Sequence, residues 1–277
     1  MILRKYINLS FVSILLMSVS GQAFSAPELS VIEFWDARDE QSQEVVDHSA
    51  WQELLNVYLN DQHESGVNRF DYKSVTKEDS KKLDTYLDYL QSRKPRQLNA
   101  DEQFAYWVNL YNAKTVDFII DGVQEDQIES IKEIRSLIVV PGPWKRKALK
   151  IEGQKVSLDM IEHGILRPIW QDHRIHFAVN CASIGCPNLF KTAYTAVNTE
   201  GLLEVAEEKF LQHPRAVSDQ NGTLVLTSLF DWYGADFAET QSEMFDYLSD
   251  FVSPDLVELM NDEPEVKYNY DWKLNAP

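Results

Sequence analysis

The segment 100–121 constrains the fold most, because apolar side chains occupy nearly every face of the helix that it predicts. Asn99 followed by Glu102 has the spacing of a helix-capping pair, and Gly122 is a common helix terminator. A helix that is apolar all round is normally buried. We therefore expect the rest of the chain to pack around this helix.

Shorter segments with helical or alternating patterns surround the central helix. Helical spacing predicts helices that begin at Ser49 and Thr76. It predicts further helices at 157–166, 199–212, 229–237 and 242–251, and Pro168 is expected to end the helix at 157–166. Turn residues and alternation predict a hairpin of 149–151 with 155–156, a strand at 174–180, and a strand at 223–227 after a turn at 221–222. The fold class that follows is α+β, with one helix-rich domain around a small antiparallel sheet.

The N-terminus has the three-part layout of a secretory signal peptide. A basic start at Arg4 and Lys5 precedes an apolar run at 11–19 and small residues at 23–25. A membrane anchor is the alternative, but the run is far shorter than the ~20 residues that span a bilayer. We expect a signal peptide at 1–25, an acidic arm at 26–48, and one domain at 49–277. The protein would then be periplasmic or secreted, with no integral membrane span after cleavage.

Composition and charge limit the partners. Apolar residues make up 44% of the chain and aromatic residues 12%, which is typical of a globular protein. The formal net charge of −18 repels nucleic acid, so we expect no nucleic-acid partner. The sequence contains no GxSxG, P-loop or GxGxxG motif, and we expect no cofactor. The expected partner is a peptide, acyl or glycan substrate of unknown identity.

Chemically versatile side chains concentrate between residues 162 and 186, where three of the six histidines and both cysteines fall. They are Glu162, His163, Arg167, His173, His176, Cys181, Ser183 and Cys186. A thiolate is a strong nucleophile, and a nearby imidazole can deprotonate the thiol. Cys181 follows a predicted strand and opens a loop, a common position for active residues.

His163 is the preferred base for Cys181. His176 stands five residues before Cys181 along the predicted strand, so its side chain leaves on the other face. His163 belongs to a separate helix and is free to approach. Asn109 and Asn112, three residues apart on one face of the central helix, need hydrogen-bond partners if buried. The expected catalytic residues are Cys181, His163, Glu162, His176, Asn109 and Asn112. The last four would orient the base or bind an oxyanion.

Four other interpretations of these residues stay open. Cys181 can be a buried structural thiol, since free cysteine is among the most buried residue types. Cys181 and Cys186 can form a small-loop disulfide, although such a loop adds little stability. His163, His173, His176 and Cys181 offer ligands for zinc but lack a tight pair such as HxxxH, and we expect no metal. Asp231, Asp236 and Glu239, near two aromatic residues, can form a carbohydrate-type site.

Several segments together resemble the family DUF547, a domain of unknown function. The segment 106–113 resembles the family's aromatic-Trp-x-Asn-x-Tyr-Asn-Ala helix, and 158–167 resembles its Ile-Glu-His-x-x-Leu-Arg block. The segment 174–187 resembles its His-Phe-Ala-x-x-Cys core, and 228–237 and 270–272 match further blocks. The likeness extends from Trp51 to Asn275. Together with the signal-peptide pattern at 1–25, it leads us to expect an exported bacterial member of the family.

In the family, the position that matches Cys181 is a regular cysteine, whereas the one that matches Cys186 can be serine in plant relatives. The resemblance therefore implies a functional thiol at Cys181 and argues against an obligatory disulfide. The Cys, His and amide or acid set is similar in residue types to that of papain-like or transglutaminase-like enzymes. We expect Arg167, Trp107, Tyr111 and Ser183 to bind substrate. The first hypothesis is a thiol-dependent hydrolase or acyl transferase. The alternative is a non-catalytic peptide- or glycan-binding module in which the Asn/His/Arg/Cys motif is structural.

Overall fold

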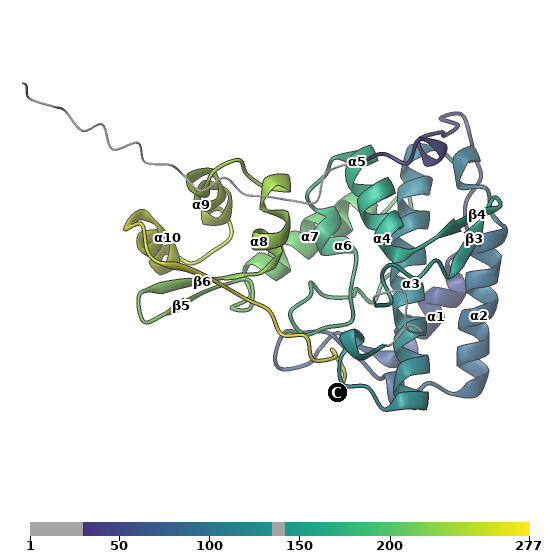
Figure 1. Ribbon diagram of the computed structural model, residues 1–277, viewed down its shortest axis with the longest axis horizontal. Helices are drawn as coiled ribbons and strands as arrows, with labels where there is room; N and C mark the ends of the chain where they lie inside the picture. Colours follow the sequence, from purple (N-terminus) through teal and green to yellow (C-terminus); the bar gives the residue numbers. More distant parts are fainter. Residues whose placement is uncertain (1–29, 135–141) are drawn as a thin grey trace, which may run out of the picture.

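The computed structural model of the chain describes residues 30–134 and 142–277 (Figure 1). The predicted signal peptide at 1–25 and the first residues of the predicted arm lie outside these ranges. The described part of the arm contains one 3₁₀ turn, Glu33–Trp35. Within the described ranges, no helix is long and apolar enough to cross a membrane.

Helix α3 (Ala100–Asp126) runs through the largest hydrophobic cluster; α2 (Lys77–Ser92) packs on it and α1 (Ser49–Tyr58) packs on α2 (Figure 1). Asn99 Oδ1 accepts a hydrogen bond from the Glu102 backbone N–H at 3.0 Å, which confirms the predicted helix start. The predicted end at Gly122 is wrong. A Cβ at this position would lie 2.6 Å from Ile128 Cδ1, so the glycine allows the chain to return closely rather than ending the helix.

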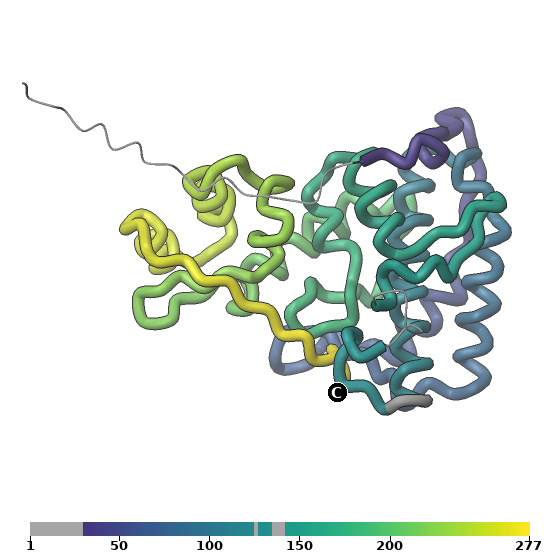
Figure 2. Tube along the Cα trace, viewed as in Figure 1, coloured from purple at the N-terminus to yellow at the C-terminus, as the bar shows by residue number. Residues whose placement is uncertain are grey.

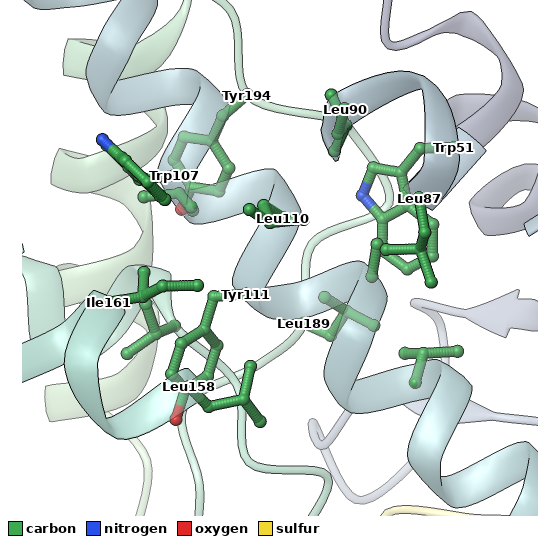
Figure 3. Packing of buried hydrophobic residues seen from close by; sticks show 14 of the residues in the cluster. Trp51, Leu87, Leu90, Trp107, Leu110, Tyr111, Leu158, Ile161, Leu189 and Tyr194 are labelled. Carbon is green, nitrogen blue, oxygen red and sulfur yellow. The ribbon is translucent and has the colours of Figure 1, made fainter. Parts of the chain in front are cut away.

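The side chains of α3 are buried on all sides, as the sequence predicts. Figure 3 shows Trp107 beside Tyr194, and Tyr111 beside Leu158 and Ile161. Each of these five side chains is at most 2% exposed. The helix therefore forms the centre of the first half of the molecule.

A mixed sheet organises the second hydrophobic cluster. Strands β5 (Val217–Gln220) and β6 (Thr223–Thr227) pair antiparallel, and β7 (Val266–Asn269) pairs parallel with β6. Helices α7 (Thr199–Leu211), α8 (Leu229–Tyr233), α9 (Gln241–Ser249) and α10 (Pro254–Asn261) complete this half. The α+β class is confirmed, but the sheet is not wholly antiparallel because β7 returns alongside β6.

Two small antiparallel pairs lie outside that sheet. One joins β1 (Leu59–Asn60) to β2 (Arg69–Phe70). The other joins β3 (Leu149–Ile151) to β4 (Gln154–Val156) and is the predicted hairpin.

The helix after the hairpin passes through Pro168 instead of ending there. It consists of α4 (Leu158–Ile161), a π-helical turn (Glu162–Leu166) and α5 (Arg167–Trp170). Proline cannot donate to the carbonyl four residues earlier, which here belongs to Gly164. That carbonyl accepts instead from the Ile32 N–H at 2.9 Å, so the π turn and the N-terminal arm together accommodate the proline.

The predicted strand at 174–180 is also wrong. Residues Ile175–Ala178 form one helical turn, α6. All four of its side chains are buried, so the alternation of Ile175 and Phe177 with other residues does not separate a buried face from an exposed one. The backbone N–H groups of Arg174 and Ile175 both bond to Asp172, which starts the turn.

The C-terminal tail returns from β7 to the first half of the molecule (Figure 2). Its carbonyls at Asp271 and Lys273 accept from the Gly185 and Ile184 N–H groups, both at 2.8 Å. Further on, the Asn275 N–H donates to Ala182 O at 3.1 Å. The tail therefore lies against the loop that follows Cys181.

Candidate active site

A cavity of about 350 Å³ opens beside the thiol segment. Its wall is built by α3, the π turn, the segment 176–186, α8 and the C-terminal tail. The lining residues are Tyr111, Trp144, Lys145, Asp159, Glu162, His163, His176, Val179, Cys181, Cys186, Leu229, Trp232, Tyr233, Tyr270 and Trp272.

Cys181 is half-buried and lines this cavity. The sulfur lies 3.0 Å from Tyr270 Oη and 3.2 Å from Ser183 Oγ. Ser183 donates its own hydroxyl hydrogen to Tyr270 Oη at 3.0 Å, which leaves the tyrosine hydrogen available to the sulfur. The two hydroxyls thus form a short chain of donors that ends on Cys181.

The two cysteines differ in acidity. Hydrogen bonding from the Cys186 side chain lowers the pKa of Cys181, burial opposes this, and the Ser183 and Tyr270 hydroxyls lower it further. Burial raises the pKa of Cys186 well above its ordinary value. Burial also raises the pKa of Tyr270, so its hydroxyl stays a donor. Cys181 is therefore the more readily ionised thiol.

Asparagine side chains fix the backbone that carries Cys181. Asn112 of α3 donates to Ala178 O at 2.9 Å and accepts from the Asn180 N–H at 2.8 Å. The Asn180 side chain in turn accepts from the Ala182 N–H and donates to Pro187 O. Ala182 has a φ of +60°, a left-handed conformation that is costly for a residue with a Cβ. The surrounding hydrogen bonds hold this strained turn in place.

The π turn brings Glu162 and His163 to the cavity together. Glu162 is buried and accepts from Tyr111 Oη at 3.0 Å. Its other oxygen lies 4.0 Å from His163 Nδ1 and 3.8 Å from His176 Nδ1. In a regular α-helix neighbouring side chains point about 100° apart. Glu162 and His163 instead stand in a wider π-helical turn, and both line the cavity.

Hydrogen bonding assigns a proton position to His163. Arg167 Nη1 lies 3.2 Å from His163 Nδ1, and a guanidinium can only donate. A neutral His163 ring in this arrangement therefore carries its proton on Nε2. That atom forms no hydrogen bond to any described residue, while the ring lines the cavity.

Asp236 joins Arg167 to His176 behind the cavity wall. Arg167 Nε and Nη2 donate to its two oxygens at 2.6 and 2.9 Å, and His176 Nε2 lies 2.7 Å from Oδ2. Burial opposes ionisation of Asp236, but these hydrogen bonds outweigh it and hold the pKa of the carboxyl below its ordinary value. Burial lowers the pKa of His176, against the effect of Asp236, so the ring is neutral and stacks on Tyr233 at 4.4 Å.

The structure brings most of the predicted site residues together. Cys181, Glu162, His163, His176 and Tyr111 line the one cavity. Ser183 contacts the Cys181 sulfur directly. Among the described residues, the hydrogen-bond partners of that sulfur include no histidine ring.

The other predicted residues lie behind the cavity wall. Arg167 holds His163 and Asp236 from behind. Asn109 binds both backbone polar groups of Tyr194. Trp107 is fully buried against Trp35. None of these side chains, nor that of Asn112, is part of the lining, and their predicted roles in catalysis or substrate binding stay predictions.

Sequence reasoning missed residues that come from distant segments. Tyr270 and Trp272 belong to the tail, and Trp144 lies just before the β3–β4 hairpin. For Tyr270 and Trp272 the family resemblance of 270–272 was a signal, but nothing in the local pattern pairs any of the three aromatic residues with Cys181. Asp236 lies in the family-like segment 228–237 and in the carbohydrate-type alternative, but neither predicts that it binds Arg167 and His176.

The structure also bears on the disulfide, metal-site and carbohydrate-site interpretations. Both cysteines are free thiols, not a disulfide. In the part of the chain that the structure describes, no group of His, Cys, Asp or Glu converges as a metal site, and His173 instead binds Glu207 at 2.7 Å. Asp231 and Glu239 are exposed and Asp236 is bound to Arg167, so these three acids do not form a paired site.

Fold and cavity together define a helix-rich α+β protein with a free thiol, two imidazoles and carboxylates at one cavity. Residues 95–211 match the family described as "Protein of unknown function, DUF547", which supports the resemblance that the sequence motifs indicate. The matched range contains α3, the π turn and both cysteines, whereas Asp236 and Tyr270 follow it. No curated protein and no solved structure gives a significant match. The likeness to papain-like or transglutaminase-like enzymes stays a prediction.

Proposed function

We propose that the protein is a thiol-dependent hydrolase or acyl transferase in which Cys181 is the nucleophile and His163 its partner histidine. The observation that carries the proposal is the Cys181 sulfur itself. It is open to a cavity of about 350 Å³ and lies within 3.2 Å of two hydroxyls. Hydrogen-bond donors around a thiol stabilise the thiolate, which is the reactive form.

The reaction begins with the thiolate, whose proton leaves to solvent through the open side of the cavity. The sulfur attacks an acyl carbon, and the carbonyl oxygen becomes an oxyanion. The leaving group departs, takes a proton from water, and leaves an acyl-Cys181 intermediate. Water or a second acceptor then takes the acyl group and restores the thiol.

His163 acts in this scheme as a hydrogen-bond donor. The hydrogen bond from Arg167 to Nδ1 supports a proton on Nε2, the opposite of what a base needs. A neutral imidazole can polarise a carbonyl by donation. We therefore assign His163 to the oxyanion in place of the base role expected from the sequence. His176, Glu162 and Asp236 are positioning residues behind it.

Trp232, Tyr270 and Trp272 form an aromatic wall of the cavity, which favours binding of an acyl donor with a flat apolar or sugar-like body. Trp232 stacks on Trp272 at 5.6 Å, and Tyr270 lies 4.5 Å from Trp272 and 4.9 Å from Trp232. Asp159 and Glu162 add negative charge to the lining, and Lys145 is the one Lys or Arg among the lining residues of the described chain. Neutral substrates fit this wall better than strongly anionic ones.

An acyl-enzyme test addresses the proposal. The protein is mixed with a phenyl thioester, and the acyl adduct is located by peptide mass spectrometry. We expect rapid acylation of Cys181, turnover of the thioester, and loss of both to background in Cys181→Ser. Acylation that is unchanged in Cys181→Ser, or that falls only on lysines, would contradict the proposal.

A peptide- or glycan-binding module is the second candidate, and the aromatic wall is the observation that favours it. Tryptophan faces bind sugar rings and apolar side chains without any chemistry. The two candidates separate in Cys181→Ser: a binding module keeps its ligand affinity and has no turnover to lose.

The proposed location is the periplasm or the extracellular medium, supported by the sequence pattern of residues 1–25. N-terminal sequencing of the protein from a secreting host tests it. We expect the processed chain to begin at Ala26, and retention of the first 25 residues would contradict this location.

A further inference from the structure

Cys186 is a second thiol next to Cys181. It is 4% exposed and lines the same cavity as Cys181. The Cys181 backbone N–H donates to Cys186 Sγ at 3.0 Å. The second sulfur is thus in contact with the residue that carries the first, and both are reduced.

The loop between the two cysteines folds back on itself. The Cys186 N–H donates to Ser183 O at 3.1 Å, and Ala182 turns through a left-handed conformation. The Asn180 side chain holds both ends of this turn, at the Ala182 N–H and at Pro187 O. The fold of this loop therefore places Cys186 Sγ 3.0 Å from the Cys181 backbone nitrogen.

We propose that Cys181 and Cys186 form a redox pair that a hydroperoxide oxidises to a disulfide, with Cys181 reacting first and Cys186 as the resolving thiol. The Cys181 thiolate attacks one peroxide oxygen; an S–O bond forms, the O–O bond breaks, and the departing alkoxide takes a proton to become an alcohol. The product is a sulfenic acid on Cys181. The Cys186 sulfur then attacks it; an S–S bond forms, the S–O bond breaks, and hydroxide leaves with the Cys186 proton as water. The two thiols supply the two electrons that reduce the peroxide.

The asymmetry between the sulfurs supports this order of events. Cys181 reaches the cavity and has the lowered pKa, whereas Cys186 is buried with a raised pKa. Peroxide reacts with thiolates that it can reach. Cys186 reacts only inside the molecule, where the Cys181 sulfenic acid is held beside it.

The short loop makes the bridge suited to reversible use. A disulfide across so few residues removes little entropy from the unfolded chain and adds little stability. A dithiol reductant can therefore return it to the free thiols. While the bridge is present, the sulfur needed for the proposed acyl transfer is blocked, so peroxide acts as an off switch for that site.

The test uses the reduced full chain and hydrogen peroxide. We expect parent protein treated with one equivalent to lose both free thiols and the mass of two hydrogen atoms. A tryptic digest should then contain a peptide bridged between Cys181 and Cys186. Cys186→Ser should instead retain a sulfenic acid on Cys181 that dimedone traps, and Cys181→Ser should keep its single thiol unreacted over the same period.

Three results would overturn the inference. They are direct over-oxidation of Cys181 in the parent without a bridge, peroxide reaction at Cys186 in Cys181→Ser, and thiol loss only between different molecules. Circular dichroism shows whether each variant is folded, and the parent protein alone gives the bridge result if a variant is not. Alkylation of Cys181 separates this inference from the proposed function. A Cys181 that alkylates rapidly but forms no bridge overturns the redox pair alone, and one that neither alkylates nor oxidises overturns both.

Discussion

Asp236 accepts hydrogen bonds from a guanidinium and an imidazole at once, and the Arg167 side chain that binds it is only 2% exposed. Removing one partner of a buried ion pair leaves the other charge without compensation. The same arginine also donates to His163 Nδ1. Arg167 therefore both neutralises the Asp236 carboxylate and determines which ring nitrogen of a neutral His163 carries the proton.

Replacement of Arg167 by alanine should lower the free energy of unfolding by about 3 kcal/mol, because the Asp236 carboxylate, whose side chain is only 14% exposed, loses its guanidinium partner. Urea unfolding followed by fluorescence measures the change. Lys267→Ala is the matched control, since Lys267 and its partner Glu265 are exposed by 59% and 66%, and should cost less than about 1 kcal/mol. An Arg167→Ala effect as small as that of the control would contradict the assigned role.

His48 predicts how stability depends on pH. Its ring is 5% exposed, binds Tyr86 Oη at 2.6 Å through Nδ1, and leaves Nε2 buried without a partner. Burial lowers the pKa of His48 from 6.5 to about 4. The unfolded chain therefore binds a proton first as pH falls, and stability drops between pH 6.5 and pH 4.

The free energy of unfolding should consequently fall by up to about 3 kcal/mol across this interval through His48 alone. The lowered pKa of His176 acts in the same direction. Urea unfolding of the parent and His48→Gln at a series of pH values measures the effect. A parent and variant with the same pH slope would contradict the assignment.

At the scale of elements, the sequence predicted those parts of the fold whose signals are local. The all-round apolar pattern predicted the burial of α3, and the Asn99 cap predicted its start. The hairpin β3–β4, helix α7 and strand β6 also follow from local turn and periodicity signals.

The predicted helix ends were wrong where tertiary contacts, and not local sequence signals, determine the backbone. Gly122 continues a helix because Ile128 needs its space, and Pro168 is tolerated because Ile32 bonds the carbonyl that proline leaves free. The candidate site shows the same difference between local signals and tertiary contacts. Residues 162–181 could be found as one dense segment, whereas Tyr270 joins the sulfur only through the path of the tail.

Asn112 connects α3 to the Cys181 segment and gives an element-scale prediction. Asn112→Ala leaves a buried N–H and a buried carbonyl unpaired, and each such loss costs about 1–3 kcal/mol. We expect the free energy of unfolding to fall by about 3 kcal/mol. Asn56→Ala on the exposed side of α1 is the control and should change it by less than about 0.5 kcal/mol. Equal effects in chemical denaturation would show that Asn112 does not hold the loop.

At the scale of the whole molecule, the cavity lies where the two hydrophobic clusters meet. Tyr111 belongs to the cluster around α3, and Leu229 belongs to the cluster around the mixed sheet. The C-terminal tail spans both halves and carries Tyr270 to the sulfur (Figure 2). The state of the thiol therefore depends on the docking of the tail.

Gly185 is the point of closest approach between tail and loop. A Cβ there would lie 2.8 Å from the Asp271 backbone nitrogen and 3.0 Å from the Tyr270 ring. Gly185→Ala should push the tail away, destabilise the fold by about 1–3 kcal/mol, and slow alkylation of Cys181. Gly201→Ala is the control, because a Cβ at that helical position meets nothing within 4 Å and should be neutral or slightly stabilising. A Gly185→Ala protein with parental stability and alkylation rate would show that the tail is not coupled to the thiol.

The proposed chemistry requires a Cys181 sulfur that is accessible and ionises readily. The most direct measurement is the rate of its reaction with iodoacetamide from pH 5 to pH 10, read by mass spectrometry at the Cys181 peptide beside an unstructured cysteine peptide. We expect Cys181 to reach half of its maximal rate at a lower pH than the peptide thiol, whose pKa is about 8.5, and Tyr270→Phe to move this midpoint upward. If Cys181 reacts more slowly than the peptide at every pH, or if its midpoint lies above that of the peptide, its sulfur is not an activated nucleophile.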